Sequence, residues 1–376
     1  MYRVLHLIKS LGRGGAETLL SETLRVHDRG QFDFHYAYFV SYKGQMGEDL
    51  RQQGAPVHCL EVDTSAAILA RLPALLRHVR EGRFDLIHCH LPVSAVVGRL
   101  VGRLIGVPVV YTEHNKQERY HPITRRVNLA TMGLNAAILS VSEDVKQSIE
   151  ARWNGDRRKL RVLINGVNTQ RFNPADYDKT RCRSELGLPA GVPIIGTVCV
   201  FRTQKRLDRW MQLARDLKQQ IPEAYFVVLG DGPMEEQVKQ LAITYQLKDS
   251  IVFPGRLEEV RPYLAAMDIY LMTSEFEGLP IAMLEAMSMA LPVVATAAGG
   301  IGEAIRSGEE GLVEPVGEWF NLLPHLLQLV QNEQLRQQLG TAARRRVLAE
   351  FSIRKMAKEL EAVYTEVLTQ SKLAQA

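Results

Sequence analysis

Hydrophobic residues along the first half of the chain form short apolar runs separated by amphipathic segments. The runs predict strands at residues 2–8, 33–40, 55–60, 84–89, 108–112, 136–141 and 161–164. Segments with apolar residues at helical spacing lie between most of them, at 15–28, 46–53, 65–80, 94–105 and 143–152. Alternation of this kind is typical of a parallel sheet wrapped by helices.

A second series of the same kind begins after Pro193, with expected strands at 193–199, 224–229, 251–253, 268–272, 292–295 and 311–314. Turn formers separate the two series, because Asn165-Gly166 and Asn173-Pro174 both favour a break in regular structure. We therefore expect an α/β protein of two Rossmann-like, doubly wound domains, at 1–172 and 173–351, facing each other across a cleft. The amphipathic helix expected at 352–376 would dock back on the first domain.

The composition of the chain indicates its cellular location, and its charged residues are unevenly distributed. The 376 residues are 46% hydrophobic and 23% charged, with no apolar run long enough to span a bilayer and no signal-peptide pattern. Four scattered cysteines without a CxxC pair indicate reduced thiols, so a cytoplasmic location is expected. Residues 1–172 carry 24 Lys and Arg against 16 Asp and Glu. This excess suggests an anionic partner, such as a phosphate-bearing acceptor or the inner face of a membrane, although an ordinary basic surface remains open. No nucleic-acid partner is expected.

The stretch from Thr273 to Thr296 has the clearest candidate chemistry. Glu277 and Glu285 are separated by seven residues, and Pro280 is expected at the first position of a helix that runs to Met289. The unpaired N–H groups at such a helix start favour an anion. Two carboxylates beside an anion site suit a ligand that has both a phosphate and hydroxyl groups.

Other candidate residues follow predicted strands, where the ligand crevice of a doubly wound sheet lies. Gly12, Gly14 and Gly15 follow the first strand in a loop that resembles a phosphate-binding turn, but the spacing is not the GxGxxG of a dinucleotide-binding dehydrogenase. In the second domain, Arg202 and Lys205 could hold a diphosphate, although isolated cations at this spacing are more often solvated. The candidate residues that share that edge of the second sheet are Arg202, Lys205, Gly230, Arg256, Glu277 and Glu285.

Histidines follow two strands of the first domain. His88 and His90 point to one side of a strand and could form a metal pair, but no third ligand is evident, so we expect no metal site. His114 follows the next strand, where it is either a crevice residue or a cap of the following loop.

Eight motifs in order make the chain resemble a retaining glycosyltransferase of the GT-B fold, in glycosyltransferase family 4 (glycosyl transferases group 1). They are GGAE (14–17), DLIHCH (85–90), TEHN (112–115), INGVNTQRFNP (164–174), the Arg202/Lys205 pair, LGDGP (229–233), FPGR (253–256) and EGLPIAMLE (277–285). The last is similar to the two-glutamate motif of the family. One departure is GLP at 278–280, where other branches of the family have Gly-Phe-Gly.

The resemblance implies a role for each matching residue. Glu285 would bind the ribose hydroxyls of the donor nucleotide, Glu277 would face the donor sugar, and Arg202 and Lys205 would neutralise the departing diphosphate. His114 would lie near the anomeric carbon. The remaining donor-binding residues would be Gly14, Gly15, Gly230, Arg256, Leu257, Leu279, Pro280 and Ile281.

The reaction implied is hexosyl transfer with retention, without metal or cofactor, from a nucleotide-sugar that is most commonly a UDP-sugar. The acceptor would be a lipid-linked or saccharide molecule in polysaccharide, O-antigen, capsule or glycolipid biosynthesis, with the enzyme peripheral to the membrane. Two alternatives remain: a nucleotide-sugar 2-epimerase of the same fold, and a non-catalytic subunit that binds nucleotide-sugars.

Overall fold

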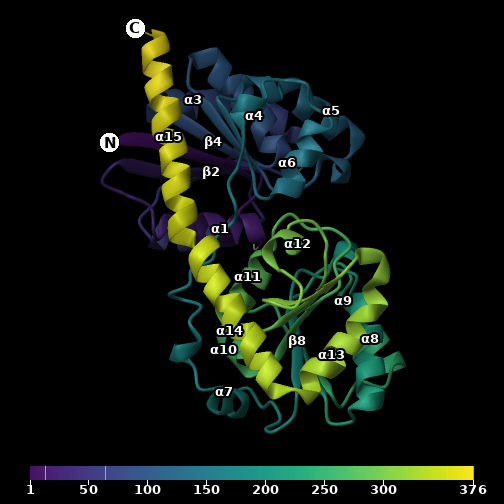
Figure 1. Ribbon diagram of the computed structural model, residues 1–376. Helices are drawn as coiled ribbons and strands as arrows, with labels where there is room; N and C mark the ends of the chain where they lie inside the picture. Colours follow the sequence, from purple (N-terminus) through teal and green to yellow (C-terminus); the bar gives the residue numbers. More distant parts are fainter. Residues whose placement is uncertain (13, 64, 376) are drawn as a thin grey trace. The chain divides into compact units, whose positions relative to one another are not determined.

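The chain divides into two compact units, which are described separately. The computed structural model describes residues 1–12, 14–63 and 65–375 (Figure 1). Unit 1 is Met1–Gly166 together with the chain from Ile353 onward, and unit 2 is Val167–Ser352. The division falls at the Asn165-Gly166 turn, before the boundary expected at 172/173, because the segment after Gly166 bonds to unit 2. The Val167 amide donates to the Phe351 carbonyl (2.8 Å), and the Phe172 carbonyl accepts from the Ser288 hydroxyl (2.6 Å).

In the described part of unit 1, seven strands form one sheet in which every pairing is parallel. The spatial order is β3-β2-β1-β4-β5-β6-β7, so the strand order reverses between β1 and β4. The bounds are β1 (Tyr2–Ile8), β2 (Phe32–Val40), β3 (Val57–Val62), β4 (Leu86–His90), β5 (Val109–Glu113), β6 (Ala137–Ser140) and β7 (Leu160–Val162). This doubly wound order confirms the predicted Rossmann-like fold.

Helices of unit 1 connect these strands and include the C-terminal helix α15. The bounds are α1 (Gly15–Leu24), α2 (Gln45–Gln52), α3 (Leu72–Gly82), α4 (Pro92–Ile105), α5 (Pro122–Thr131), α6 (Glu143–Glu150) and α15 (Ile353–Gln375). Short 3-10 turns lie at Ser65–Arg71, Gln117–Arg119, Met132–Leu134 and Arg157–Lys159.

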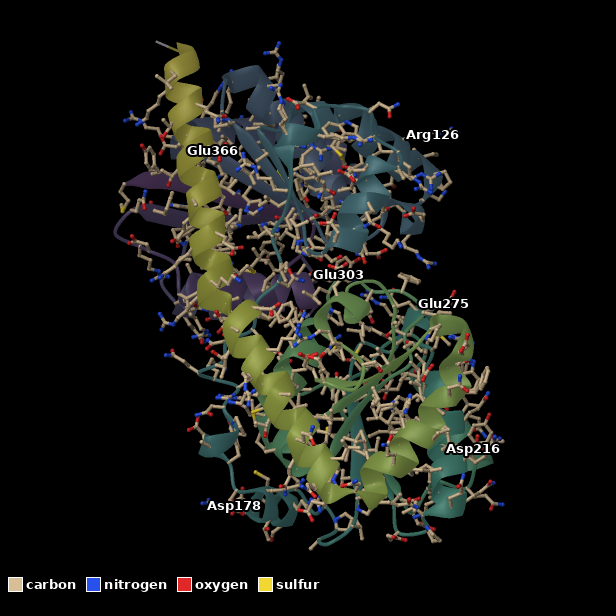
Figure 2. The ribbon with its side chains drawn as sticks, in the orientation of Figure 1. Arg126, Asp178, Asp216, Glu275, Glu303 and Glu366 are labelled. Atoms are coloured by element: carbon tan, nitrogen blue, oxygen red, sulfur yellow. The ribbon has the colours of Figure 1, made fainter. Side chains whose placement is uncertain are left out.

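Helix α15 packs on unit 1 with its apolar face. Met356, Leu360 and Tyr364 recur at helical spacing and are buried, and the Tyr364 ring contacts Phe32 of β2. Glu366, labelled in Figure 2, lies on the more exposed side of the helix. It forms an ion pair with Arg161 (2.5 Å). The long C-terminal helix is therefore part of the N-terminal unit.

In the described part of unit 2, six parallel strands form a second sheet of order β10-β9-β8-β11-β12-β13. The bounds are β8 (Ile194–Val198), β9 (Tyr225–Leu229), β10 (Ile251–Gly255), β11 (Ile269–Met272), β12 (Val293–Thr296) and β13 (Gly311–Glu314). The order reverses between β8 and β11. A ligand crevice is expected beyond the carboxyl ends of these two strands.

Helices cover both faces of this second sheet. The bounds are α7 (Lys179–Glu185), α8 (Leu207–Gln220), α9 (Glu235–Thr244), α10 (Arg261–Ala266), α11 (Ile281–Ser288), α12 (Ile301–Ala304), α13 (Leu322–Gln331) and α14 (Glu333–Glu350). Short 3-10 turns lie at Pro174–Asp176, Thr203–Lys205 and Val316–Asn321. Trp210 of α8 is fully buried, and its indole N–H donates to the Leu271 carbonyl (3.1 Å), which fixes α8 against the strand that precedes Glu277.

Across both units, the described helices include none that is both long and apolar enough to cross a bilayer.

Candidate functional site

Two loops meet at the reversal point of the unit 2 sheet. The first follows β8 and includes Lys205, and the second follows β11 and begins at Thr273. The Thr273 hydroxyl donates to the Lys205 carbonyl (3.1 Å), and the Glu275 amide donates to the Gln204 carbonyl (2.8 Å). These bonds hold the two loops together at the edge where a ligand is expected.

Lys205 and Glu277 form an ion pair between these loops. The Lys205 ammonium donates to Glu277 Oε1 (2.5 Å), and the Ser274 hydroxyl donates to the same oxygen (2.6 Å). The side chains are only 16% and 7% exposed. Water screens such a pair poorly, so each charge depends on the other. The structure thus brings together a candidate diphosphate cation and a candidate sugar-binding carboxylate.

Helix α11 begins one residue later than the sequence pattern predicts. Pro280 has an extended ψ of 119° and occupies the N-cap, so the helix runs Ile281–Ser288 and Pro280 is not its first residue. The prediction was wrong because proline fixes φ near −65°, a value shared by the first helical position and by extended backbone. The N–H groups of the first helical turn still lack intrahelical partners.

Glu285 lies on the buried side of α11. Its residue exposure is only 9%, and its charge acts on Tyr270 of the neighbouring strand β11. Burial raises the pKa of the Tyr270 phenol, and the Glu285 charge adds to that rise. The phenol therefore stays protonated and donates to the Val198 carbonyl at the end of β8 (3.1 Å). Glu285 thus lies near the ends of β8 and β11.

Backbone contacts confine the loop that leads into α11. The Gly300 amide donates to the Gly278 carbonyl (2.7 Å). A Cβ at Gly300 would lie 2.3 Å from that carbonyl oxygen, so the close approach requires glycine. Leu279 and Pro280 are buried within this segment. The helix start is therefore held in place by tight backbone packing.

Gly230 lies at a second close approach of backbone. Its φ is +129°, and a Cβ there would lie 1.8 Å from the Cys199 carbonyl oxygen. The backbone carbonyl of the adjacent Asp231 accepts a hydrogen bond from the Phe201 amide (2.7 Å). The Asp231 carboxylate forms an ion pair with Arg256 (2.7 Å). This network joins the loops after β8, β9 and β10, so Gly230 and Arg256 share the edge that contains Lys205.

Arg202 differs from Lys205 in its surroundings. Its side chain is exposed and has no ion-pair partner among the residues that the structure describes, whereas Lys205 is already paired. Leu257, next to Arg256, is half-buried. Arg202 is thus the cation at this edge whose charge is not balanced by a described carboxylate.

The remaining predicted residues lie in unit 1. Gly14 is the N-cap of α1, with extended backbone, and Gly15 is the first residue of that helix. His114 follows β5, and its Nε2 lies 3.3 Å from His90 Nδ1. Burial lowers the pKa of His114 to about 4, so the imidazole is neutral at pH 7.

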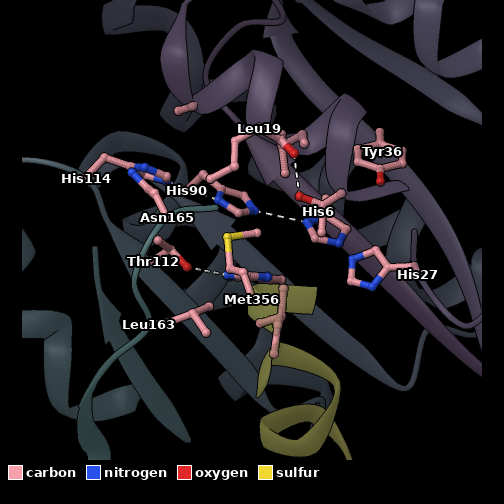
Figure 3. Close-up of a pocket in the computed structure, with 15 residues that line it drawn as sticks. His6, Leu19, His27, Tyr36, His90, Thr112, His114, Leu163, Asn165 and Met356 are labelled. Atoms are coloured by element: carbon pink, nitrogen blue, oxygen red, sulfur yellow. Dashed lines mark hydrogen bonds between the residues drawn. The ribbon is translucent and has the colours of Figure 1, made fainter. Parts of the chain in front are cut away.

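A small cavity lies beside His114 within unit 1 (Figure 3). Its lining includes His6, His27, His88, His90 and His114. Sequence reasoning missed His6, although it lies in the first predicted strand and the structure pairs it in register with His88. One ring nitrogen from each of His6, His88 and His90 lies within 4.8 Å of the other two, so the fold brings a third histidine to the pair seen in the sequence.

Comparisons with known proteins agree with this architecture. Residues 178–346 match the family model for glycosyl transferases group 1, and residues 13–171 match the model for glycosyltransferase family 4. N-acetyl-alpha-D-glucosaminyl L-malate synthase of Bacillus anthracis is 30% identical over 77% of this chain and 76% of its own. UDP-Gal:alpha-D-GlcNAc-diphosphoundecaprenol alpha-1,3-galactosyltransferase of Escherichia coli is 23% identical over 79% of each chain.

Among solved structures, Anabaena Alr3699/HepE in complex with UDP-glucose superposes with a TM-score of 0.87 at 20% identity, covering 97% of this chain and all of that one. Together, the matched models, the relatives and the two doubly wound units show that the chain belongs to glycosyltransferase family 4, with the GT-B fold.

Proposed function

We propose that this chain transfers a hexosyl group, with retention of anomeric configuration, from a UDP-sugar to a lipid-linked or saccharide acceptor. The observation that carries the proposal is the buried Lys205–Glu277 ion pair at the reversal point of the unit 2 sheet. It joins a cation suited to a diphosphate with a carboxylate suited to sugar hydroxyls.

The names of similar proteins support the choice of donor and acceptor class. The E. coli relative is named for a UDP-Gal donor and a diphosphoundecaprenol-linked acceptor, and Anabaena HepE is described in complex with UDP and with UDP-glucose. A uridine diphosphate donor and a lipid-linked acceptor in polysaccharide or glycolipid assembly are therefore the first substrates to test.

Residues of unit 2 would bind the donor. Glu285 accepts hydrogen bonds from the ribose hydroxyls, and Arg202 and Lys205 face the diphosphate. The α11 start contributes backbone N–H groups at Ile281 and its neighbours, because Pro280 has none. Arg256 and Leu257 border the base, beside the turn at Gly230. In unit 1, the proposed roles of Gly14, Gly15 and His114 toward the donor remain predictions.

The transfer step needs no dedicated protein base. The bond between the anomeric carbon and the β-phosphate oxygen breaks, and the acceptor hydroxyl oxygen bonds to that carbon from the same face. The acceptor proton passes to the departing phosphate oxygen, so the products are the glycoside and UDP. Arg202 and Lys205 stabilise the charge that develops on the diphosphate. NMR of the product shows whether the anomeric configuration is retained, and an inverted anomeric centre contradicts the proposed step.

Glu277 would act on the sugar rather than on the nucleotide. The substitution Glu277→Gln should therefore lower kcat more than it weakens donor binding. Steady-state kinetics together with direct titration of UDP separate the two effects. Equal losses in UDP affinity and in kcat would place Glu277 at the nucleotide instead.

We further propose that no metal ion or other cofactor takes part at the diphosphate, because the cations of unit 2 supply the charge that a divalent ion supplies elsewhere. Addition of Mg²⁺ or Mn²⁺ should leave the transfer rate unchanged. A rate that depends on either ion would refute this part of the mechanism.

A cytoplasmic enzyme acting on a lipid-linked acceptor would work at the inner face of the membrane, and helix α5 is the surface we propose for that contact. Ile123 and Val127 are 65% and 43% exposed there, and Arg126 on the same helix is also exposed (Figure 2). Apolar and cationic side chains together suit an anionic bilayer. The wild type should sediment with vesicles that contain phosphatidylglycerol, whereas the double variant Ile123→Ser/Val127→Ser should stay in the supernatant. Equal retention on neutral vesicles would contradict a charge-dependent contact.

A screen of UDP-sugars by thermal shift would identify the donor, and incubation of that donor without acceptor tests the main alternative. Without acceptor, a transferase only hydrolyses the donor slowly, and the configuration at C2 of the sugar stays the same. Conversion to the 2-epimer would instead show an epimerase. Tight binding without either reaction, across a full acceptor panel, would point to a non-catalytic subunit.

A further inference from the structure

Three histidines from two adjacent strands converge inside unit 1. His6 lies on β1, and His88 and His90 lie on β4. Parallel pairing places His6 directly beside His88, and the two-residue period of a strand puts His90 on the same face. All three are buried, at 2%, 1% and 5% exposure. The convergence follows from strand register and does not depend on a flexible loop.

Hydrogen bonds hold these rings with nitrogen atoms facing one another. His6 Nδ1 lies 3.0 Å from His90 Nε2, an interaction marked by a dashed line in Figure 3. His90 Nδ1 lies 3.3 Å from His114 Nε2. If His90 donates its Nδ1–H to His114, its Nε2 presents a lone pair toward His6. This is the arrangement of a metal-binding histidine whose other nitrogen is fixed by an outer partner.

His88 also has hydrogen-bond partners outside the three-histidine cluster. Its Nδ1 lies 2.6 Å from the Tyr364 hydroxyl, and its Nε2 lies 2.7 Å from the Thr112 hydroxyl. A hydroxyl can donate or accept, so either nitrogen could release its partner and bind an ion while the other stays fixed.

One buried nitrogen of the cluster lacks a partner. His6 Nε2 makes no hydrogen bond to any residue that the structure describes. An unpaired buried polar atom is costly, and a bound ion or water is one of the few explanations for such an atom in a native protein. The adjoining cavity has a volume of about 30 Å³, which exceeds the roughly 10–15 Å³ that one water needs. The site therefore has room for a small ligand beside His6.

We propose that His6, His88 and His90 bind a divalent first-row transition metal such as Zn²⁺. Three imidazole ligands suit Zn²⁺, Ni²⁺ or Cu²⁺ and not Mg²⁺ or Ca²⁺, which prefer oxygen. Nitrogens bound tetrahedrally at about 2.0–2.1 Å lie about 3.4 Å apart. With His6 Nδ1 and His90 Nε2 as ligand atoms, their 3.0 Å separation must open slightly, and His6 Nε2 faces away from the metal. A separation as long as the 4.8 Å upper limit would have to close by about 1.4 Å. The fourth position is taken by water from the cavity.

Hydrogen bonding connects the proposed metal site to a residue of the candidate active site. His90 Nδ1 lies 3.3 Å from His114 Nε2. The metal would immobilise His90 and, through it, the hydrogen-bonded His114.

The test uses the full chain with any affinity tag removed, stripped with a chelator and titrated with Co²⁺. Visible d–d absorption reports the coordination of Co²⁺, and elemental analysis after gel filtration reports the stoichiometry. We expect one Co²⁺ per chain in the wild type, displaceable by Zn²⁺. His6→Gln and His90→Gln should each weaken binding at least about 10-fold.

His78→Gln is the matched control, because His78 lies in the same unit and stacks on His58 (ring centroids 4.4 Å apart) outside the cluster. It should bind Co²⁺ like the wild type. His6→Cys guards against a variant that fails only by misfolding, since a thiolate ligand retains the ion and adds a sulfur-to-cobalt charge-transfer band. A wild type that binds no Co²⁺, a loss confined to His78→Gln, or a His6→Cys protein that binds Co²⁺ without the new band overturns the proposal.

Discussion

Removal of the Lys205 ammonium tests whether the buried ion pair of unit 2 organises the candidate donor site. Lys205→Met keeps the length and the apolar stem of the side chain but leaves the Glu277 carboxylate with only the Ser274 hydroxyl among its contacts described above. A carboxylate that is 7% exposed cannot recover its hydration in that position.

The expected cost follows from the burial of the two charges. Breaking a fully buried pair by removing one partner costs about 3–5 kcal/mol. Lys205 is 16% exposed and the hydrogen bond from Ser274 survives. We therefore expect the substitution to lower the free energy of unfolding of unit 2 by about 2–3 kcal/mol. For a unit of this size, the midpoint of thermal unfolding should fall by about 4–12 °C.

Tryptophan fluorescence can report on the unfolding of unit 2 alone. The chain has three tryptophans, and only Trp153 belongs to unit 1, while Trp210 and Trp319 lie in unit 2. In a Trp153→Phe background, urea unfolding followed by fluorescence reports on unit 2. The variants Lys205→Met, Glu277→Gln and the double variant complete a double-mutant cycle.

The double variant should be more stable than the sum of the single losses predicts, by about 1–2 kcal/mol, because no charge is left uncompensated. Glu275→Gln is the control, since Glu275 is 43% exposed and its pair with Arg206 (3.2 Å) should contribute less than about 1 kcal/mol. Additivity of the two single losses to within about 0.3–0.5 kcal/mol would refute the reasoning.

Three other predictions follow from single positions. Glu285→Ala should weaken UDP binding about 10-fold or more, measured by calorimetry, and unchanged affinity would remove Glu285 from the nucleotide site. Gly230→Ala should destabilise unit 2 by more than about 2 kcal/mol in urea unfolding, because the added Cβ meets the Cys199 carbonyl and φ is +129°. Gly317→Ala is its control, with nothing within 4 Å of the new atom, and equal effects would contradict the steric argument. Burial lowers the pKa of His78 from 6.5 to about 4, so its contribution to stability is complete above pH 6.5 and is lost as pH falls toward 4. Between pH 7 and pH 5, the free energy of unfolding should fall less in His78→Gln than in the wild type. An identical pH dependence of the two proteins would refute the lowered pKa of His78.

Several features of this protein were predictable from local sequence. The first apolar run predicts a strand at residues 2–8, and the structure has β1 at Tyr2–Ile8. The alternation of strands and helices predicts the doubly wound fold, and the spacing of Glu277 and Glu285 predicts one loop and one helical carboxylate. Hydrophobic periodicity and turn chemistry act over a few residues, so a linear sequence contains this information.

The start of α11 shows the limit of local reasoning. Proline at 280 predicts a helix boundary but not which side of it the proline occupies. The adjoining loop decides the matter, because the Gly278 carbonyl is held by the Gly300 amide, 22 residues further along the chain.

Sequence by itself therefore determined the class of fold, the order of its elements and the residue types at the ends of its strands. Only the tertiary structure decided which of those residues meet. Lys205 reaches Glu277 across 72 positions, and His6 reaches His90 across 84. Both contacts depend on which strands lie side by side and in what register, and these properties arise from the packing of the whole sheet rather than from any short stretch of chain.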